Sequence, residues 1–76
     1  MKRLERAKRI EEALKSMTHD GIETWYAIHS AECQEVGVYI PREAAQMAVK
    51  YGADEIALIY DDSDETYATL KLDEMD

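Results

Sequence analysis

Apolar residues recur along the first seventeen positions with the spacing of one face of an α-helix. Leu4, Ala7, Ile10, Leu14 and Met17 follow one another at intervals of three or four residues, which places them on one side of a helix. Charged residues occupy most of the positions between them, and turn-forming residues follow at positions 18–21. The pattern predicts an amphipathic helix over residues 2–17.

Two segments rich in β-branched and aromatic residues follow. The composition of residues 22–30 favours a strand, whereas the capping-box spacing of Asp20 and Glu23 would also suit a helix; we favour the strand. Residues 35–40 form a clearer strand, because Val36, Val38 and Ile40 alternate to one side. If both segments are strands, residues 31–34 connect them as a hairpin.

A second helix is predicted to begin at Pro41, whose fixed φ suits the first helical position. Glu43 lies in its first turn, where a negative charge complements the helix dipole, and Gly52 is the expected C-cap. The apolar run at 56–60, the polar turn at 61–64 and the alternating segment at 66–72 then predict a second hairpin.

Together these elements predict an α+β fold in a single domain spanning residues 1–76. A leading helix at 2–17 precedes an acidic β-β-α-β-β body at 22–72, and residues 73–76 are expected to fray. One small antiparallel sheet would carry the helices on one face. The expected lining of its other face is Trp25, Tyr39, Tyr51 and Tyr67.

Cysteine content and hydropathy indicate the compartment. Cys33 is the only cysteine among 76 residues, which excludes an intrachain disulfide and favours a reducing compartment. No apolar run approaches the ~20 residues of a membrane span, and the basic N-terminus lacks the apolar segment of a secretory signal. We therefore expect a cytoplasmic protein (host-cell cytoplasm if it is viral) without a membrane partner. A homodimer is compatible with so small a core.

Charge is distributed unevenly along the chain. Residues 1–16 carry six basic and three acidic side chains, a net charge of +3, whereas residues 17–76 carry a net charge of −11. Residues 54–76 alone carry −8. Such asymmetry indicates an interaction role. Phosphates would be repelled by the acidic body, so we expect a basic nucleic-acid-binding protein or complex as the partner, with no direct contact to nucleic acid.

Acidic residues near the second hairpin are the candidate partner-binding site. They are Asp61, Asp62, Asp64 and Glu65 in the turn, joined by Asp54, Glu55, Asp73 and Glu74. Carboxylates on a rigid hairpin can present negative charge at roughly the density of a nucleic-acid backbone, which a Lys/Arg groove would accept.

Catalytic and metal chemistry find little support in the residue types. The turn lacks the glycine that a calcium loop needs at its sixth position, where Tyr67 stands. His29 and Cys33 are too few for a zinc site and lack an orienting group for a nucleophilic dyad. The glycines are scattered, so no phosphate loop is present. We expect a protein that is not an enzyme and has no metal or other cofactor.

The chain resembles the small acidic proteins that phages use against host defences, including anti-CRISPR proteins. The resemblance rests on its size, its net charge of −8, and the order of helix 41–51, strand 55–60, acidic turn 61–64 and strand 66–72. It implies a stoichiometric, non-enzymatic inhibitor that occupies a nucleic-acid-binding surface of a host complex. The class shares no sequence motif, so no residue roles are carried over.

Two other functions stay open at this point. A regulatory or structural module would bind through an apolar interface, either the helical stripe from Leu4 to Met17 or the aromatic sheet face. A minimal enzyme or metal protein would use His29, Cys33 and the acidic turn.

Overall fold

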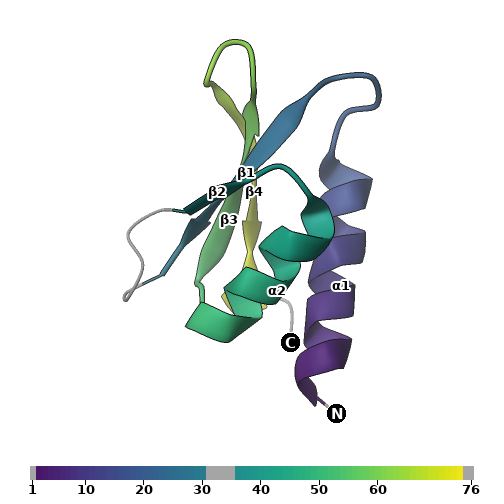
Figure 1. Cartoon of the computed structure of the whole chain (residues 1–76), viewed down its shortest axis with the longest axis vertical. Coiled ribbons are helices and arrows are strands. Elements are labelled where there is room, and N and C mark those ends of the chain that lie inside the picture. Colours follow the sequence, from purple (N-terminus) through teal and green to yellow (C-terminus); the bar gives the residue numbers. More distant parts are fainter. Residues whose placement is uncertain (1, 31–35, 75–76) are drawn as a thin grey trace.

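The computed structural model describes residues 2–30 and 36–74. Two helices lie against one face of a four-stranded antiparallel sheet (Figure 1). The elements are α1 (Lys2–Met17), β1 (Thr24–His29), β2 (Val36–Val38), α2 (Pro41–Tyr51), β3 (Glu55–Tyr60), β4 (Thr66–Lys71) and a 3₁₀ helix, η1 (Leu72–Glu74). The α+β class, the element order and the strand at residues 22–30 are confirmed. The predicted 31–34 connection lies outside the described residues.

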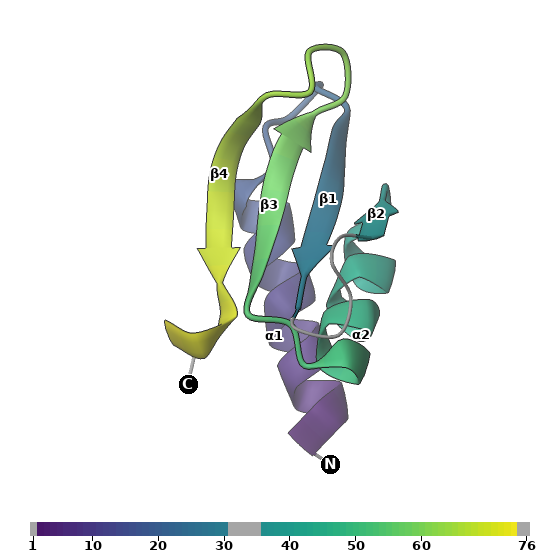
Figure 2. The same cartoon turned by 90° about the vertical axis from the view of Figure 1, so that its left-hand side faces the viewer.

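The sheet has the strand order β2-β1-β3-β4. Because β1 is antiparallel to both β2 and β3, these two neighbours run in the same direction with β1 between them. The chain passes from β2 to β3 through α2, which crosses the helical face of the sheet. Figure 2 shows the opposite face, over which no helix of the described chain lies.

The main core fills the space between the helices and the sheet. Ile10 and Leu14 of α1 are fully buried, as are Ile28, Ile56 and Leu58 of the central strands. In α2 the buried positions are alanines, whose small side chains allow the helix to approach its neighbours closely. The α1 stripe predicted from the sequence is thus used within the chain itself from Ala7 to Met17, and the side chain of Leu4 lies outside the described part.

Tyr26 contributes the largest fully buried side chain, and its hydroxyl has a defined partner. Thr18 Oγ1 donates to the Leu14 carbonyl at 2.6 Å, so the Tyr26 hydroxyl donates to Thr18 Oγ1 at 2.7 Å. Burial raises the pKa of Tyr26. The bonded hydroxyl ties the end of α1 to the centre of the sheet without leaving a polar group unsatisfied.

The uncovered sheet face holds a smaller apolar cluster of Ala27, Ala57 and Ile59 with Trp25 packed against it. A Cβ at residue 37 would lie 3.0 Å from the Trp25 ring, closer than ordinary contact, so any other residue there would require the ring to shift by a few tenths of an ångström. Trp25 lies on this face as predicted. The prediction for Tyr67 was wrong, because that side chain packs against the main core.

A β-bulge explains where Tyr67 lies. The β3–β4 register pairs Leu58 with Ala68 but Ile59 with Thr66, so Tyr67 is an extra residue and the simple alternation of sides fails there. Its hydroxyl lies 2.7 Å from Thr24 Oγ1.

The C-terminal segment continues past β4 into η1, which includes Asp73 and Glu74 and in which Leu72 is buried. The expectation that residues 73–76 fray stays a prediction. The Leu72 amide donates to the Asp54 carbonyl at 2.9 Å, and the Leu72 carbonyl accepts from Arg6 at 3.2 Å. These contacts hold the chain beyond β4.

Candidate functional site: an acidic tip

The turn between β3 and β4 holds four of the predicted site residues in a fixed arrangement. The Asp64 amide donates to the Tyr60 carbonyl at 2.8 Å, and the Tyr60 amide donates to the Glu65 carbonyl at 2.9 Å. Asp64 has φ 57°, a left-handed conformation that Asp adopts more readily than most residues. Asp62, Asp64 and Glu65 are exposed, and Asp61 is partly buried.

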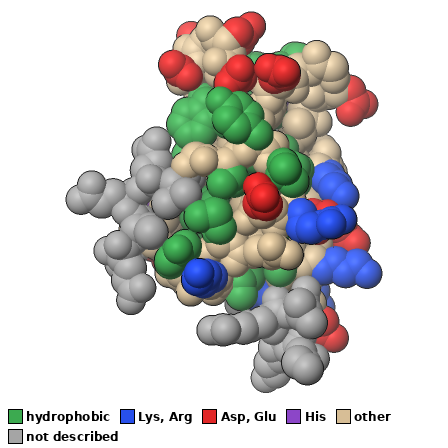
Figure 3. Space-filling view, viewed as in Figure 1, with side chains coloured by type: hydrophobic (Ala, Val, Ile, Leu, Met, Phe, Trp, Pro, Cys, Tyr) green, Lys and Arg blue, Asp and Glu red, His purple; other side chains and the backbone are tan. Residues whose placement is uncertain are grey.

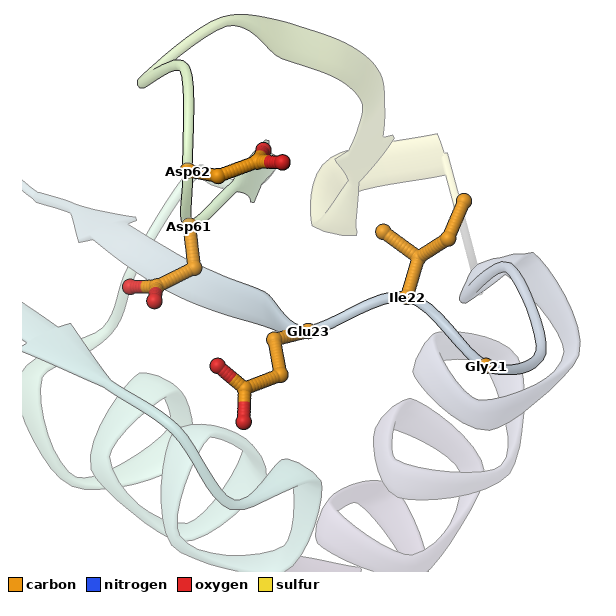
Figure 4. Close-up of a pocket in the computed structure, with 5 residues that line it drawn as sticks. All are labelled: Gly21, Ile22, Glu23, Asp61 and Asp62. Atoms are coloured by element: carbon orange, nitrogen blue, oxygen red, sulfur yellow. The ribbon is translucent and has the colours of Figure 1, made fainter.

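The start of β1 adds a carboxylate that the sequence did not single out. The Asp61 amide donates to the Glu23 carbonyl at 3.1 Å, which places these two residues side by side. Together with Gly21, Ile22 and Asp62 they line a hollow of about 230 Å³ (Figure 4). We name the group Glu23, Asp61, Asp62, Asp64 and Glu65 the acidic tip.

Tyr39, which directly follows β2, also contacts the acidic tip. Its hydroxyl donates to Asp61 Oδ1 at 2.9 Å. This hydrogen bond, reinforced by the negative charge of Asp61, raises the pKa of Tyr39. Although its hydroxyl is bonded, the Tyr39 side chain is 65% exposed, which is unusual for a large aromatic group.

Three rings pack against one another beside the tip. Tyr60 and Tyr67 have ring centroids 4.4 Å apart, and His19 lies 4.4 Å from Tyr67. His19 Nδ1 is 3.3 Å from the Tyr60 hydroxyl. These contacts attach the α1–β1 connection to the β3–β4 hairpin, so both segments that supply tip carboxylates are held by packing as well as by backbone hydrogen bonds.

The other four predicted site residues lie at the opposite end of the sheet. Asp54 and Glu55 lie at the start of β3, just before it and at its first residue, and Asp73 and Glu74 follow β4 in η1. The antiparallel pairing of β3 with β4 brings these positions together. β3 is six residues long, so this group and the tip lie about 20 Å apart along the strand. The eight residues therefore form two groups, not one surface.

Basic residues lie near the group formed by Asp54, Glu55, Asp73 and Glu74. Glu55 pairs in register with Lys71, and Arg6 lines a hollow together with Asp54 and Asp73. In contrast, the segments that form the tip contain no Lys or Arg between positions 16 and 41 or between 51 and 70. Among the described residues, no tip carboxylate forms an ion pair.

Basic side chains lie away from the tip. Figure 3 shows acidic groups gathered at the end that carries the turn, and lysines and arginines lower on the molecule. Glu11 lies among the basic residues. It pairs with Lys15 at 2.9 Å and lies 3.9 Å from Arg42, and the hydrogen bond from Lys15 lowers its pKa.

Within residues 2–30 and 36–74, no three His, Cys, Asp or Glu side chains are grouped as metal ligands. His29 is partly buried, and Cys33 lies outside the described residues. No helix in this part of the chain is long and apolar enough to span a membrane.

Comparison of the chain with protein-family models, curated proteins and solved structures finds no match.

Proposed function

We propose that this chain is a non-enzymatic binding protein whose acidic tip occupies a Lys/Arg-lined, nucleic-acid-binding surface of another protein. The observation that carries the proposal is the uncompensated charge of the tip. Two separate segments bring five carboxylates together there, and in the described part of the chain no cation accompanies them. A surface that served only solubility would not require acidic residues from distant segments to be fixed in one place.

The physical mechanism is electrostatic competition. A basic groove attracts a concentrated negative surface from a distance and aligns it during approach, which raises the association rate. Backbone hydrogen bonds hold the backbone of the segments that carry the tip carboxylates, so little backbone entropy is lost on docking. Bound in this way, one molecule blocks one groove, which makes the inhibition stoichiometric.

The proposed target is a nucleic-acid-binding host defence complex in the cytoplasm. This part of the proposal is supported by the resemblance to small acidic phage inhibitors, whose size, charge and element order the chain shares. The negative charge of the acidic body also favours a basic, nucleic-acid-binding protein as the direct partner over nucleic acid itself, because the phosphates of nucleic acid would be repelled.

The test is an affinity pull-down from a host-cell lysate, eluted with a salt gradient and competed with DNA or RNA. We expect a nucleic-acid-binding complex that is released as salt rises and is displaced by nucleic acid. The variant Asp61→Lys/Asp62→Lys/Asp64→Lys should lose this partner. Circular dichroism checks that the variant is folded.

A matched control uses the other acidic group. The variant Asp54→Lys/Asp73→Lys/Glu74→Lys alters the net charge by the same amount at the far end of the sheet. It should change the affinity by less than about threefold, because exposed charges far from an interface act weakly and through screened interactions. Equal losses in the two variants, or binding that is insensitive to salt, would refute the proposal.

The uncovered sheet face supports a second candidate function, a regulatory or structural module. Trp25 and Ile59 lie on that face, whereas Ile10 and Leu14 are already buried in the chain's own core. An interface on this face predicts binding that persists in high salt and is lost in Trp25→Ala, provided that the variant is folded by circular dichroism. A second copy of the chain recovered alone in high salt would favour it.

A further inference from the structure

A second hollow adjoins the acidic tip on the side of Tyr39. It is lined by Glu23, Thr24, Tyr39 and Asp61, and it shares Glu23 and Asp61 with the hollow of Figure 4. In that view the carboxylates of Glu23 and Asp61 extend to the same side of the backbone, away from Ile22. We call this second site the Tyr39 hollow.

The available groups in this hollow suit a planar cation. Tyr39 donates to Asp61 Oδ1, which fixes the carboxylate while leaving its other oxygen open. Glu23 has no ion pair among the described residues. Acceptor oxygens from two carboxylates thus lie beside an exposed phenol ring, and no Lys, Arg or His side chain is among the residues that line the hollow.

An arginine side chain matches both features. Its guanidinium group presents several N–H donors in one plane, pairs with carboxylates and stacks on aromatic faces, whereas the ammonium of lysine is a strongly hydrated point charge. A metal ion fits less well, since no metal-ligand group occurs within the described chain and a phenol ring offers it no ligand. An anionic nucleic acid would be repelled.

We propose that the Tyr39 hollow receives the guanidinium group of an arginine of the protein partner. This inference rests on the proposed function and adds to it a specific chemical group and place. Electrostatic mimicry alone would treat lysine and arginine alike. A defined arginine site gives the acidic tip a way to distinguish one basic surface from another.

The test compares two synthetic peptides of equal length and charge. One contains arginines and the other lysines, and in both peptides Gly and Ser residues separate the basic residues. Binding is followed by titration of the full chain with detection by NMR. We expect the arginine peptide to bind roughly fivefold more tightly, the size of one exposed cation–π contact. The largest amide shifts should occur at Glu23, Tyr39 and Asp61.

Three variants separate the ring from the charge. Tyr39→Phe keeps the ring and should keep the preference for arginine, whereas Tyr39→Leu should bind the two peptides equally. Ile40→Ala is the matched control, because Ile40 is a neighbouring exposed apolar residue that lines neither hollow, and it should retain the preference. All three variants are checked for folding by circular dichroism.

The outcomes distinguish the two proposals. Equal binding of both peptides to the unmodified chain, lost in the Asp61→Lys/Asp62→Lys/Asp64→Lys variant, overturns the arginine site and leaves the acidic-tip proposal standing. Shifts confined to residues outside the tip, or no binding of either peptide, overturn both. A preference for arginine that survives Tyr39→Leu also overturns the assignment to this hollow.

Discussion

The two ends of the sheet carry similar numbers of carboxylates and use them differently. At the acidic tip the carboxylates have no cationic neighbours in the described chain, and the large apolar side chains of Ile22 and Tyr39 are exposed beside them. At the other end Asp54 and Asp73 share a hollow with Arg6, and Leu72 is buried. One end exposes carboxylates without cations together with apolar side chains, and the other closes the fold.

The difference shows that composition alone does not identify an interaction surface. Carboxylates beside a cation contribute to the protein's own electrostatic balance, whereas carboxylates held without one repel each other and are stabilised when a cationic partner arrives. On the proposed function, the repulsion among the tip carboxylates costs folding free energy that binding of the cationic partner would recover.

The largest expected contrast between the ends comes from truncating one apolar side chain at each. Leu72→Ala should destabilise the fold by about 3 kcal/mol, since it leaves a cavity in the core. Ile22→Ala should change stability by less than about 0.5 kcal/mol, because Ile22 is 43% exposed. Urea unfolding followed by circular dichroism measures both. Similar losses would show that the two ends are packed alike.

A smaller effect is expected at Arg6. Its guanidinium donates to the Leu72 carbonyl, and Arg6→Met keeps the apolar stem while removing that donor and the charge. We expect a loss of about 1 kcal/mol, the usual net value of such a hydrogen bond. Arg9→Met, at an exposed position of the same helix, is the control and should be close to neutral. A neutral Arg6→Met would mean that the far end is not held by this contact.

The smallest effect concerns the ionisation of Tyr39. Its pKa is raised by the hydrogen bond to Asp61 and by that residue's charge, so the folded chain keeps the phenol proton at a pH where the unfolded chain releases it. The stabilisation of the fold that comes from this raised pKa is fully present below about pH 10, the ordinary tyrosine pKa. It is lost as the pH rises through the pKa that Tyr39 has in the folded chain.

NMR titration of the tyrosine ring carbons can measure this shift. Asp61→Asn should move the Tyr39 pKa back toward its ordinary value, since the amide accepts a hydrogen bond without the charge. The pKa of Tyr26, raised by burial, should stay where it is and serves as an internal reference. An unchanged Tyr39 pKa in Asp61→Asn would contradict the pairing.

Much of the fold could be predicted because local patterns agreed with it. The periodicity of residues 2–17 and the Pro41 and Gly52 signals locate both helices, and Gly52 indeed caps α2 in the left-handed conformation with φ 62°. The separation of the eight acidic residues into two groups could also have been inferred. An antiparallel hairpin with its turn at 61–64 necessarily places Asp54 beside Asp73, far from that turn.

The missed features depend on non-local geometry. Glu23 joins the tip because β1 pairs with β3 in a register that ends beside Asp61, and Tyr39 reaches it from beyond β2. Neither pairing has a local sequence signal. Tyr67 was placed on the wrong face because a bulge breaks the alternation of β4, and no glycine or proline marks that bulge.

The order of the strands also governs how the chain reaches this fold. Each outer strand pairs with its neighbour in sequence, so the β1–β2 and β3–β4 hairpins close short loops and can form early. The central β1–β3 ladder joins residues on either side of α2, so its closure spans a longer stretch of chain than either hairpin. Contacts of long sequence separation slow folding, so formation of the central ladder should be the rate-limiting step. The acidic tip, which needs β1 and β3 side by side, would then be completed only in that last step.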